Sequence, residues 1–159
     1  MHFRILAVGK VKSIYLQQEI KHYQGRLRPY ARVEIIEVAE GKASRKQEKE
    51  ALKLLLMEEG QKLLRQASLG KYNLALDEKG KNFSSLQLAS TLARLEREGH
   101  MPLNFFIGGA KGLDRTVLQA SDLTLSLSRL TFPHQLTRLI LLEQLYRCCK
   151  IIKNEPYHY

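Results

Sequence analysis

The sequence predicts an α/β domain with a mainly parallel sheet that is covered by helices on both faces. Short apolar runs typical of strands alternate with longer helix-like runs almost throughout the 159 residues, which is the pattern of consecutive βαβ units. Several of these runs are nearly continuous in apolar residues, as is typical of strands buried on both faces. No internal repeat, low-complexity tract or linker divides the chain. Residues 1–159 are therefore predicted to form a single domain with its own core.

Five strands are expected from the distribution of apolar and turn residues. The first, His2 to Val8, is apolar and ends at Gly9. The second alternates charged and apolar side chains, which suits a half-exposed strand near a sheet edge. The third, Tyr72 to Leu76, ends in the polar loop 77–81. In order along the chain, the expected strands are residues 2–8, 31–39, 72–76, 103–107 and 123–127.

Five helices are expected between and after these strands, and capping residues mark two of their starts. Ser44 and Ser84 are each followed three residues later by glutamine, at the spacing of a capping box. Gly99 closes the helix that Ser84 begins. The helix after Ser44 mixes charges of both signs, so its outer face is expected to be merely solvated. Its buried face is expected to contain Leu52, Leu55, Leu56, Leu63 and Leu64. In order, the expected helices are residues 13–28, 44–67, 84–98, 113–120 and 135–153.

The last of these helices is apolar around nearly its whole circumference. Its apolar residues are Leu136, Leu139, Ile140, Leu141, Leu142, Leu145, Tyr146, Cys148, Cys149, Ile151 and Ile152. A helix that is apolar on all sides must be covered on all sides. One side can pack on the sheet, and a second copy of the chain is the natural cover for the other. The pattern therefore predicts a homodimer.

The turn after the fourth strand has three glycines within residues 108–112. A strand that leads into a glycine-rich turn and then a helix lets backbone approach a ligand closely. The spacing matches neither the dinucleotide fingerprint nor a phosphate P-loop. Because ligands of parallel sheets bind beyond the C-terminal strand ends, the loops after Leu76, Ile107 and Leu127 are the candidate ligand loops. A tight turn without a ligand is the alternative that the glycines alone leave open.

Charge is the strongest signal in the composition. The chain has 26 Lys or Arg and 16 Asp or Glu, a formal net charge of +10. Residues 1–32 alone carry seven basic side chains and one acidic one, a net charge of +6. This imbalance indicates a polyanionic partner, and nucleic acid is the first choice, against the alternative that basic charge only maintains solubility.

The remaining composition points to a soluble protein of a reducing compartment. Cys148 and Cys149 are adjacent, too close for an ordinary disulfide, and they lack the His pair that would complete a metal site. No run approaches the length of a membrane span, and residues 1–8 lack the form of a signal peptide. We therefore expect a cytoplasmic protein without metal and without membrane association.

Three segments and the tail together resemble one known family. They are the turn Phe106–Leu113, the segment Leu127–His134 and the triplet Leu145–Arg147, followed by Asn154–His158. In this order, near the end of a chain of this length, they closely resemble the RlmH family, the ribosomal large-subunit pseudouridine N3-methyltransferases of the SPOUT class. The resemblance covers the whole chain. It implies transfer of a methyl group from S-adenosyl-L-methionine (AdoMet) to N3 of a pseudouridine in helix 69 of 23S rRNA, on the assembled 70S ribosome.

The resemblance also implies a homodimer and a deep trefoil knot in the C-terminal half, a feature that periodicity cannot reveal. AdoMet would lie among the knotted loops, and no metal is required. The family's cofactor positions fall here on Leu76, Gly108, Leu127, Ser128, Arg129, Leu130, Thr131 and Phe132. They belong to the three loops that the strand-end rule selects.

On the side of the target base, the candidate catalytic residues are Arg147, Tyr157 and His158. His158 titrates near neutrality and could take the N3 proton. Tyr157 could stack on the base, and Arg147 could stabilise negative charge on the base oxygens. Glu143 precedes Arg147 by four residues, so a simple surface ion pair is the alternative for Arg147. Which of the three, if any, is a general base stays open.

The substrate RNA must use the surface of this small domain and of its partner subunit. The candidate phosphate contacts, chosen for sign and placement, are Lys10, Lys12, Arg26, Arg28 and Arg129. Two other readings remain: a SPOUT methyltransferase that acts on another RNA, and a non-catalytic RNA- or ribosome-binding protein that has kept the fold. AdoMet binding separates the second from the first. A nucleotide-dependent oxidoreductase would need a Gly-x-Gly-x-x-Gly turn, which is absent.

Overall fold

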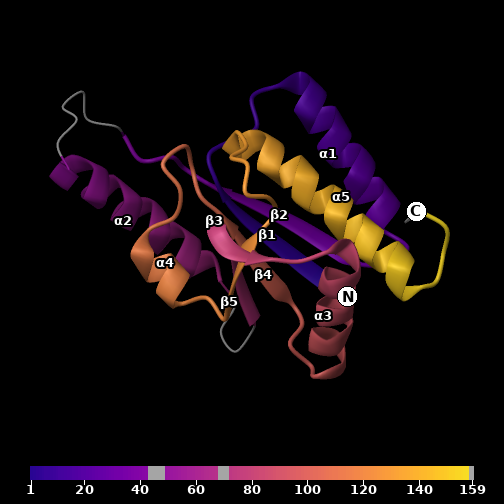
Figure 1. Ribbon diagram of the computed structural model, residues 1–159. Helices are drawn as coiled ribbons and strands as arrows, with labels where there is room; N and C mark the ends of the chain where they lie inside the picture. Colours follow the sequence, from indigo (N-terminus) through magenta and orange to yellow (C-terminus); the bar gives the residue numbers. More distant parts are fainter. Residues whose placement is uncertain (43–48, 68–71, 158–159) are drawn as a thin grey trace.

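The computed structural model describes residues 1–42, 49–67 and 72–157, and in them one parallel sheet lies between two layers of helices (Figure 1). The strands are β1 (His2–Val8), β2 (Arg32–Val38), β3 (Tyr72–Asn82), β4 (Leu103–Ile107) and β5 (Leu123–Ser126). Their order across the sheet is β2-β1-β4-β3-β5, and each of the four pairings is parallel. The predicted α/β fold class is therefore confirmed, with β2 at a sheet edge as its alternating sequence indicates. The trefoil knot stays a prediction.

The helices agree with the sequence patterns to within a few residues. They are α1 (Ile14–Leu27), α2 (Lys49–Gln66), α3 (Ser85–Arg97), α4 (Arg115–Gln119) and α5 (His134–Ile152). Ser84 and Gln87 form the predicted capping box, in which each side chain accepts a backbone N–H from the other residue. Gly99 follows this helix with a φ of 79°, a conformation that favours glycine. The predicted cap of the second helix, Ser44 with Gln47, lies outside the described residues.

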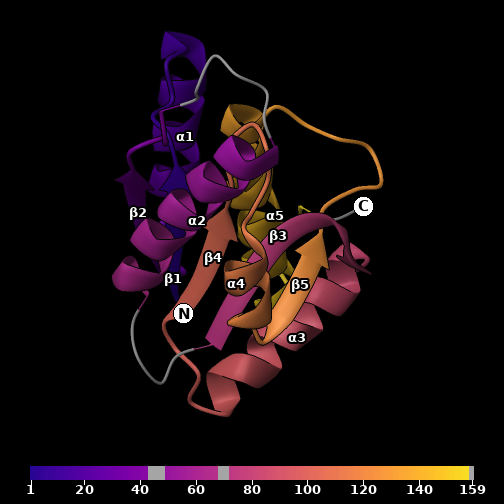
Figure 2. The same cartoon turned by 90° about the vertical axis from the view of Figure 1, so that its left-hand side faces the viewer.

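The two faces of the sheet are covered by different helices, as Figures 1 and 2 show. Helices α1, α3 and α5 cover one face, and α2 and α4 cover the other. Successive side chains of β4 pack into the cores on opposite faces of the sheet, because neighbouring side chains of a strand point in opposite directions. Phe105 belongs to the core beneath α1, α3 and α5, whereas Phe106 belongs to the core beneath α2 and α4. Both side chains are fully buried, which explains why this strand has no polar alternation.

The third strand differs from its prediction. Tyr72–Leu76 is a strand, but the polar residues that follow do not end it: pairing with β5 resumes beyond them, and Leu125 pairs with both Leu76 and Lys81. Residues 77–80 therefore form a bulge within the strand. Gly80 is required there, since a Cβ would lie 2.7 Å from the carbonyl oxygen of Thr124 on β5. Polar composition suggested a loop, but backbone pairing with β5 decides the structure.

Helix α2 is also only partly as predicted. Leu63 is fully buried, but Leu52, which was expected on the buried face, leaves 42% of its surface exposed. Glu59 was expected on a solvated face and is instead buried, where its carboxylate accepts the backbone N–H of Gly41 at 2.8 Å. The carboxylate can be buried because it receives this hydrogen bond.

Helix α5 is fixed to the sheet by a buried arginine. The guanidinium of Arg138 is fully buried and donates to the carbonyl oxygens of Val8 and Gly9, at 2.8 and 2.6 Å. It also pairs with the carboxylate of Glu37 at 2.7 Å. Burial lowers the pKa of Arg138, and Glu37 opposes that shift. The start of α5 is thus held against the ends of β1 and β2.

The apolar circumference of α5 is largely covered within one chain. Leu141, Leu142 and Leu145 are fully buried, in the core beneath α1, α3 and α5. Cys148 and Cys149 are buried free thiols, and burial raises the pKa of each, to about 12 and about 11. Apolar residues of α5 that remain only partly buried are Leu136, Leu139, Ile140, Ile151 and Ile152. None of the described helices is long and apolar enough to cross a membrane.

Candidate functional site

A pocket of about 670 Å³ lies at the bulge of β3 and beyond the C-terminal ends of β4 and β5. Its walls come from three segments, residues 76–79, 107–112 and 127–132, together with the first turn of α5. These segments converge because β3 lies between β4 and β5 in the sheet and all three strands run in the same direction. The three loops selected from the sequence therefore line one pocket, which we call the strand-end pocket.

The glycine turn forms the floor of this pocket and is closed on itself. Gly112 adopts a φ of 83°, and its N–H donates to the carbonyl oxygen of Gly109 at 3.1 Å. A Cβ on Gly108 would lie 2.3 Å from the carbonyl oxygen of Gly112 and 2.9 Å from the backbone nitrogen of Leu113. No side chain fits at Gly108 unless the turn opens. Glycine is needed in this turn because two backbone segments approach each other closely. Since glycine has no side chain, the surface of the turn that lines the pocket stays open to a ligand.

One wall of the strand-end pocket is apolar. Leu76, Leu127, Leu130 and Phe132 line it, and Leu130 leaves 72% of its surface exposed. A local hydrogen bond stabilises the loop that carries Leu130: the backbone N–H of Leu130 donates to the Ser128 hydroxyl oxygen at 3.0 Å. The exposed Leu130 side chain therefore provides an apolar surface on which a planar, weakly polar ring could pack.

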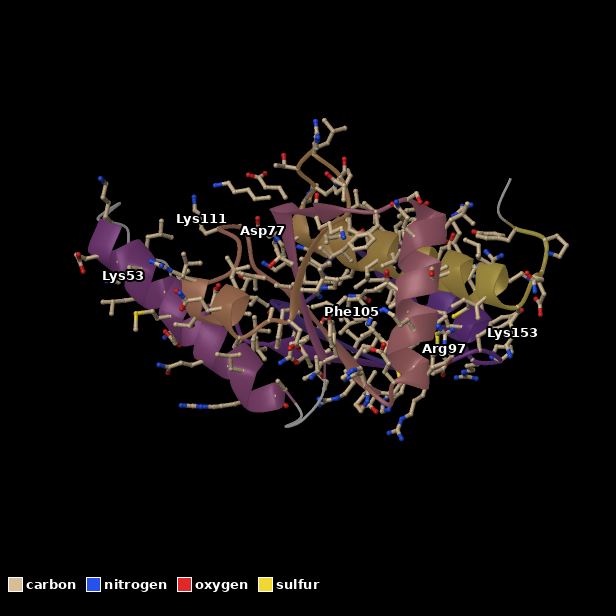
Figure 3. All side chains as sticks on the ribbon, turned by 60° about the horizontal axis from the view of Figure 1, so that its bottom comes forward. Lys53, Asp77, Arg97, Phe105, Lys111 and Lys153 are labelled. Atoms are coloured by element: carbon tan, nitrogen blue, oxygen red, sulfur yellow. The ribbon has the colours of Figure 1, made fainter. Side chains whose placement is uncertain are left out.

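The lining also includes polar side chains of both signs of charge. Asp77, Glu78 and Lys79 come from the bulge of β3, and Lys111 from the glycine turn; Figure 3 shows Asp77 and Lys111 on the same side of the molecule. His134, at the start of α5, also lines the pocket, and its Nε2 atom lies 3.7 Å from a carboxylate oxygen of Glu40. Within residues 1–42, 49–67 and 72–157, no group of three or more His, Cys, Asp or Glu side chains could hold a metal ion.

The structure brings together seven of the eight positions named as cofactor residues. Leu76, Gly108, Leu127, Ser128, Leu130, Thr131 and Phe132 all line the strand-end pocket. Arg129 is the exception: it is exposed and is not among the lining residues. The lining also includes Asp77, Glu78, His134 and Thr137, which the sequence argument did not name as ligand-binding. Asp77 and Glu78 directly follow the apolar part of β3, and His134 and Thr137 lie at the start of α5. These positions are the signals that could have identified them.

The candidate catalytic residues lie at the other end of α5. Arg147 donates to the carboxylate of Glu143 through Nε at 3.1 Å and through Nη2 at 2.6 Å. Its guanidinium lies 4.8 Å from the centre of the Tyr157 ring, and the Tyr157 hydroxyl contacts the same Glu143 oxygen at 3.3 Å. The hydrogen bond to Glu143 raises the pKa of Arg147, so the group keeps its positive charge. His158 lies outside the described residues.

Aromatic side chains surround this group. The Tyr157 ring packs against Tyr146 with ring centres 4.9 Å apart. Arg26 of α1 lies 4.2 Å from the centre of the Tyr146 ring and 5.1 Å from that of Tyr157. Tyr23 of α1 completes the set, with its hydroxyl 3.5 Å from that of Tyr157. We call Tyr23, Arg26, Glu143, Tyr146, Arg147 and Tyr157 the tail cluster. The sequence argument named Tyr157 but missed Tyr23 and Tyr146 as site residues, although Tyr23 and Arg26 are three residues apart, as required to face one neighbour.

The strand-end pocket and the tail cluster are separate within one chain. Neither Arg147 nor Tyr157 lines the pocket. His134 lines it and lies on the same helix as Arg147, thirteen positions earlier, which corresponds to roughly 20 Å along the helix axis. A methyl group held in the pocket could not reach a base held at the tail cluster of the same chain.

The partly buried phenol of Tyr23 gives the tail cluster a distinctive pH dependence. Burial, with a smaller effect from the Tyr157 hydrogen bond, raises the pKa of Tyr23 from 10.0 to about 12. Since the folded state holds this proton more tightly, its contribution to stability is complete below pH 10 and is lost as the pH rises through 12. Absorbance titration of the tyrosines should therefore show a component near pH 12 that disappears in Tyr23→Phe. Ionisation of every tyrosine near pH 10 would contradict this expectation.

Comparison with known proteins identifies relatives over the whole chain. The family model described as "Predicted SPOUT methyltransferase" matches residues 1–158. The chain is 44% identical over 158 residues to the ribosomal RNA large subunit methyltransferase H of Carboxydothermus hydrogenoformans, covering 99% of each chain. It is 45% identical over 159 residues to the protein of the same name from Natranaerobius thermophilus, covering 100% of both.

Solved structures support the fold at much lower identity. A methylase family protein from Haemophilus influenzae Rd KW20 is similar with a TM-score of 0.54 at 9% identity, covering 99% of this chain and 70% of that one. At this identity the likeness concerns the fold alone. It agrees with the parallel sheet between two helical layers.

Proposed function

Because the chain belongs to the SPOUT methyltransferases, and among them to the ribosomal RNA large subunit methyltransferase H family, we propose that it methylates N3 of a pseudouridine in 23S rRNA. The methyl donor is AdoMet, the target lies in helix 69, and the substrate is the assembled 70S ribosome in the cytoplasm. The protein acts as a homodimer. The net charge of +10 supports a nucleic-acid substrate.

The observation that carries this proposal is the strand-end pocket. Three loops that are distant in sequence meet there, and the turn at Gly108 admits no side chain. The apolar wall at Leu127, Leu130 and Phe132 suits the adenine ring. The carboxylates of Asp77 and Glu78 and the ammonium groups of Lys79 and Lys111 suit a ligand that carries charges of both signs. The lining therefore fits AdoMet, which supplies a methyl group on a cationic sulfonium that leaves as a neutral thioether.

The chain's own residues have to bind and orient the methyl donor and the target base, and they have to exclude water from the site. Residues of the strand-end pocket would hold the methyl donor and orient it for in-line attack by the base nitrogen. The N3–H proton of the base must leave, and His158 is the proposed acceptor. Arg147 places a positive charge beside the base oxygens, where negative charge develops as N3 loses its proton. Tyr157 supplies a ring for the base to stack on.

We further propose that the two halves of the site come from different subunits of the homodimer. Within one chain the strand-end pocket and Arg147 are roughly 20 Å apart along α5. A two-fold axis beside α5 would place the tail cluster of one subunit at the pocket of the other. Leu136 and Ile140, which are only partly buried on α5, provide an apolar surface for this contact.

The test of the proposed function is methyl transfer from radiolabelled AdoMet to 70S ribosomes that lack this modification. Free rRNA and tRNA serve as competing substrates, and mass spectrometry identifies the labelled nucleoside. We expect label on a pseudouridine of 23S rRNA. Label on tRNA alone would keep the fold and the cofactor but reject the substrate. The absence of label together with the absence of AdoMet binding would favour a non-catalytic ribosome-binding protein.

The shared site predicts complementation between two inactive variants. Arg147→Ala should slow methyl transfer by about 100-fold or more while leaving AdoMet affinity unchanged. Gly108→Arg should abolish AdoMet binding, because its side chain has no room in the turn. Mixed dimers of the two carry one complete site, so an equal mixture should recover about a quarter of the wild-type activity.

The control for this mixture is each variant mixed with itself, which should stay inactive. If both halves of the site came from one chain, the mixture would remain as inactive as its components. Activity above the level of the separate variants would require that each active site contain residues from both subunits.

A further inference from the structure

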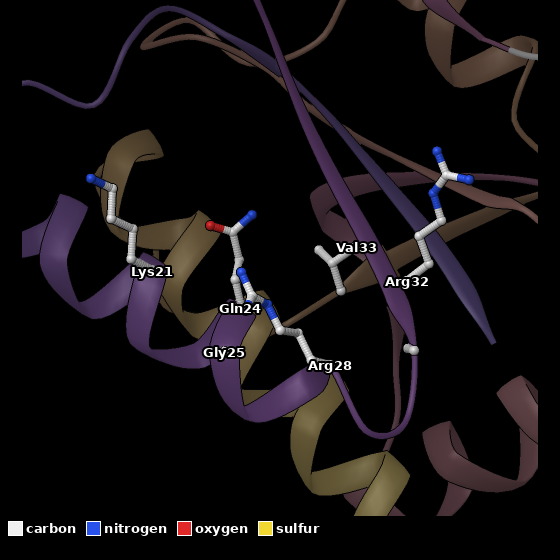
Figure 4. Close-up of a pocket in the computed structure, with 7 residues that line it drawn as sticks. Lys21, Gln24, Gly25, Arg28, Arg32 and Val33 are labelled. Carbon is white, nitrogen blue, oxygen red and sulfur yellow. The ribbon is translucent and has the colours of Figure 1, made fainter.

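A second hollow, of about 810 Å³, lies between the C-terminal half of α1 and the edge strand β2 (Figure 4). It shares no lining residue with the strand-end pocket. Its lining includes Lys21, Gln24, Gly25, Arg28, Arg32 and Val33, and we call it the α1–β2 groove. Figure 4 shows Lys21, Gln24 and Arg28 projecting from α1 and Arg32 and Val33 from β2.

The groove carries positive charge without acidic residues in its lining. The side chains of Lys21 and Arg28 form no ion pair or hydrogen bond with the other described residues, although the backbone N–H of Arg28 caps α1. Arg32 is paired with Glu34 at 2.9 Å, although its side chain is 72% exposed. No Asp or Glu lines the groove. Two free cations and one paired cation therefore face the same hollow, and the nearby carboxylate of Glu34 is held by Arg32. The net charge of the lining favours an anionic ligand.

Helix periodicity places the groove and the tail cluster on opposite sides of α1. Lys21, Gly25 and Arg28 follow one another at four and three residues, so they share one side of the helix. Tyr23 and Arg26 lie on the opposite side, where they contact Tyr146 and Tyr157. The same two turns of α1 thus contribute to the base side of the site on one side and to a basic groove on the other.

We propose that the α1–β2 groove binds the sugar-phosphate backbone of the substrate RNA, across the width of α1 from the target nucleotide. The proposal rests on the proposed function, because it assigns the groove to the same substrate. Lys21 and Arg28 are seven residues apart, or roughly 10 Å along the helix. A single small anion would not neutralise both, whereas consecutive phosphates of one RNA strand would. Arg28 can bind a phosphate through two N–H groups, and the Gln24 amide adds a neutral donor.

The first test removes the two free cations together. Lys21→Ala/Arg28→Ala is compared with Lys53→Ala/Arg97→Ala, which removes one lysine and one arginine from exposed positions on α2 and α3 (Figure 3). We measure the affinity for unmodified 70S ribosomes at 50 and 200 mM salt. Each lost phosphate contact lowers the salt slope by 0.7 to 0.9. The affinity ratio of wild type to the groove variant should therefore be about 10-fold larger at the lower salt concentration. The control should match the wild type.

The second test adds charge instead of removing it. A Cβ at Gly25 would meet no atom within 4 Å, so a larger side chain can be placed there without a clash. Gly25→Glu and Gly25→Gln have nearly the same shape and differ in charge. We expect Gly25→Glu to weaken ribosome binding and raise KM, and Gly25→Gln to have a much smaller effect. Equal behaviour of the two variants would overturn the assignment of the groove to phosphates.

Failure of this inference can be distinguished from failure of the proposed function. If the wild type methylates 23S rRNA while Lys21→Ala/Arg28→Ala keeps the wild-type KM and salt slope, only the groove assignment is wrong. If the wild type transfers no methyl group, the proposed function is wrong, and the salt slope of ribosome binding still tests the groove. AdoMet affinity should be unchanged in all groove variants, since the groove and the strand-end pocket share no residue.

Discussion

Gly108→Ala is expected to weaken AdoMet binding by more than about 100-fold, which is about 2.7 kcal/mol. The added Cβ would lie 2.3 Å from the Gly112 carbonyl oxygen and 2.4 Å from its carbon. Both are backbone atoms, so no side-chain rotation relieves the clash, and the turn from Gly108 to Gly112 must open. That turn forms the floor of the strand-end pocket. Calorimetric titration with AdoMet measures the loss directly.

The same substitution should also cost about 1–3 kcal/mol of folding free energy, as overpacking usually does. Gly99→Ala is the matched control. Gly99 has a φ of 79° and open space around it, so alanine there introduces backbone strain without a clash. It should lower stability by about 1 kcal/mol and leave AdoMet affinity intact. If Gly108→Ala bound AdoMet like the wild type, the glycine turn would not be part of the cofactor site.

Arg138→Met is expected to have the largest effect on stability, about 2–4 kcal/mol. Most of it comes from the two buried backbone carbonyl oxygens, since the Glu37 side chain is 32% exposed. The substitution leaves the carboxylate of Glu37 without its buried partner and the carbonyl oxygens of Val8 and Gly9 without a donor. A methionine fills much of the volume but supplies no hydrogen bond, so the desolvation penalty of these groups is not recovered. Urea unfolding followed by circular dichroism measures the change.

The control is Arg94→Met on α3. Arg94 also pairs with a glutamate, Glu98, at 2.9 Å, but both side chains are about half exposed. An exposed pair at this helical spacing contributes about 0.3–0.5 kcal/mol, so stability should change little. A loss at Arg138 no larger than that at Arg94 would mean that the buried network does not anchor α5. Because His134 and Thr137 line the pocket from the same helix turn, Arg138→Met should also weaken AdoMet binding.

Local patterns in the sequence were sufficient for the fold class and for the outline of the pocket. Alternation of strand and helix requires a parallel sheet, and parallel strands place their ends together. The glycines at 108–112 and the loops after Leu76 and Leu127 could therefore be selected without coordinates. The capping box at Ser84 and Gln87 is equally local, since both partners lie within one helical turn. The alternating residues of β2 indicated a sheet edge for the same reason.

Only the tertiary structure decided the features that depend on contacts between distant residues. Arg138 reads as an ordinary helix residue, but it reaches Gly9, 129 positions away, and becomes fully buried. The polar residues 77–80 stay within β3 because β5 supplies a pairing partner beyond them. Arg147 and Tyr157 lie far from the strand-end pocket because a straight helix separates them from His134. Sequence periodicity shows which side of a helix or strand is apolar. The contacts described here depend instead on which distant segment packs against each side, and periodicity does not contain that information.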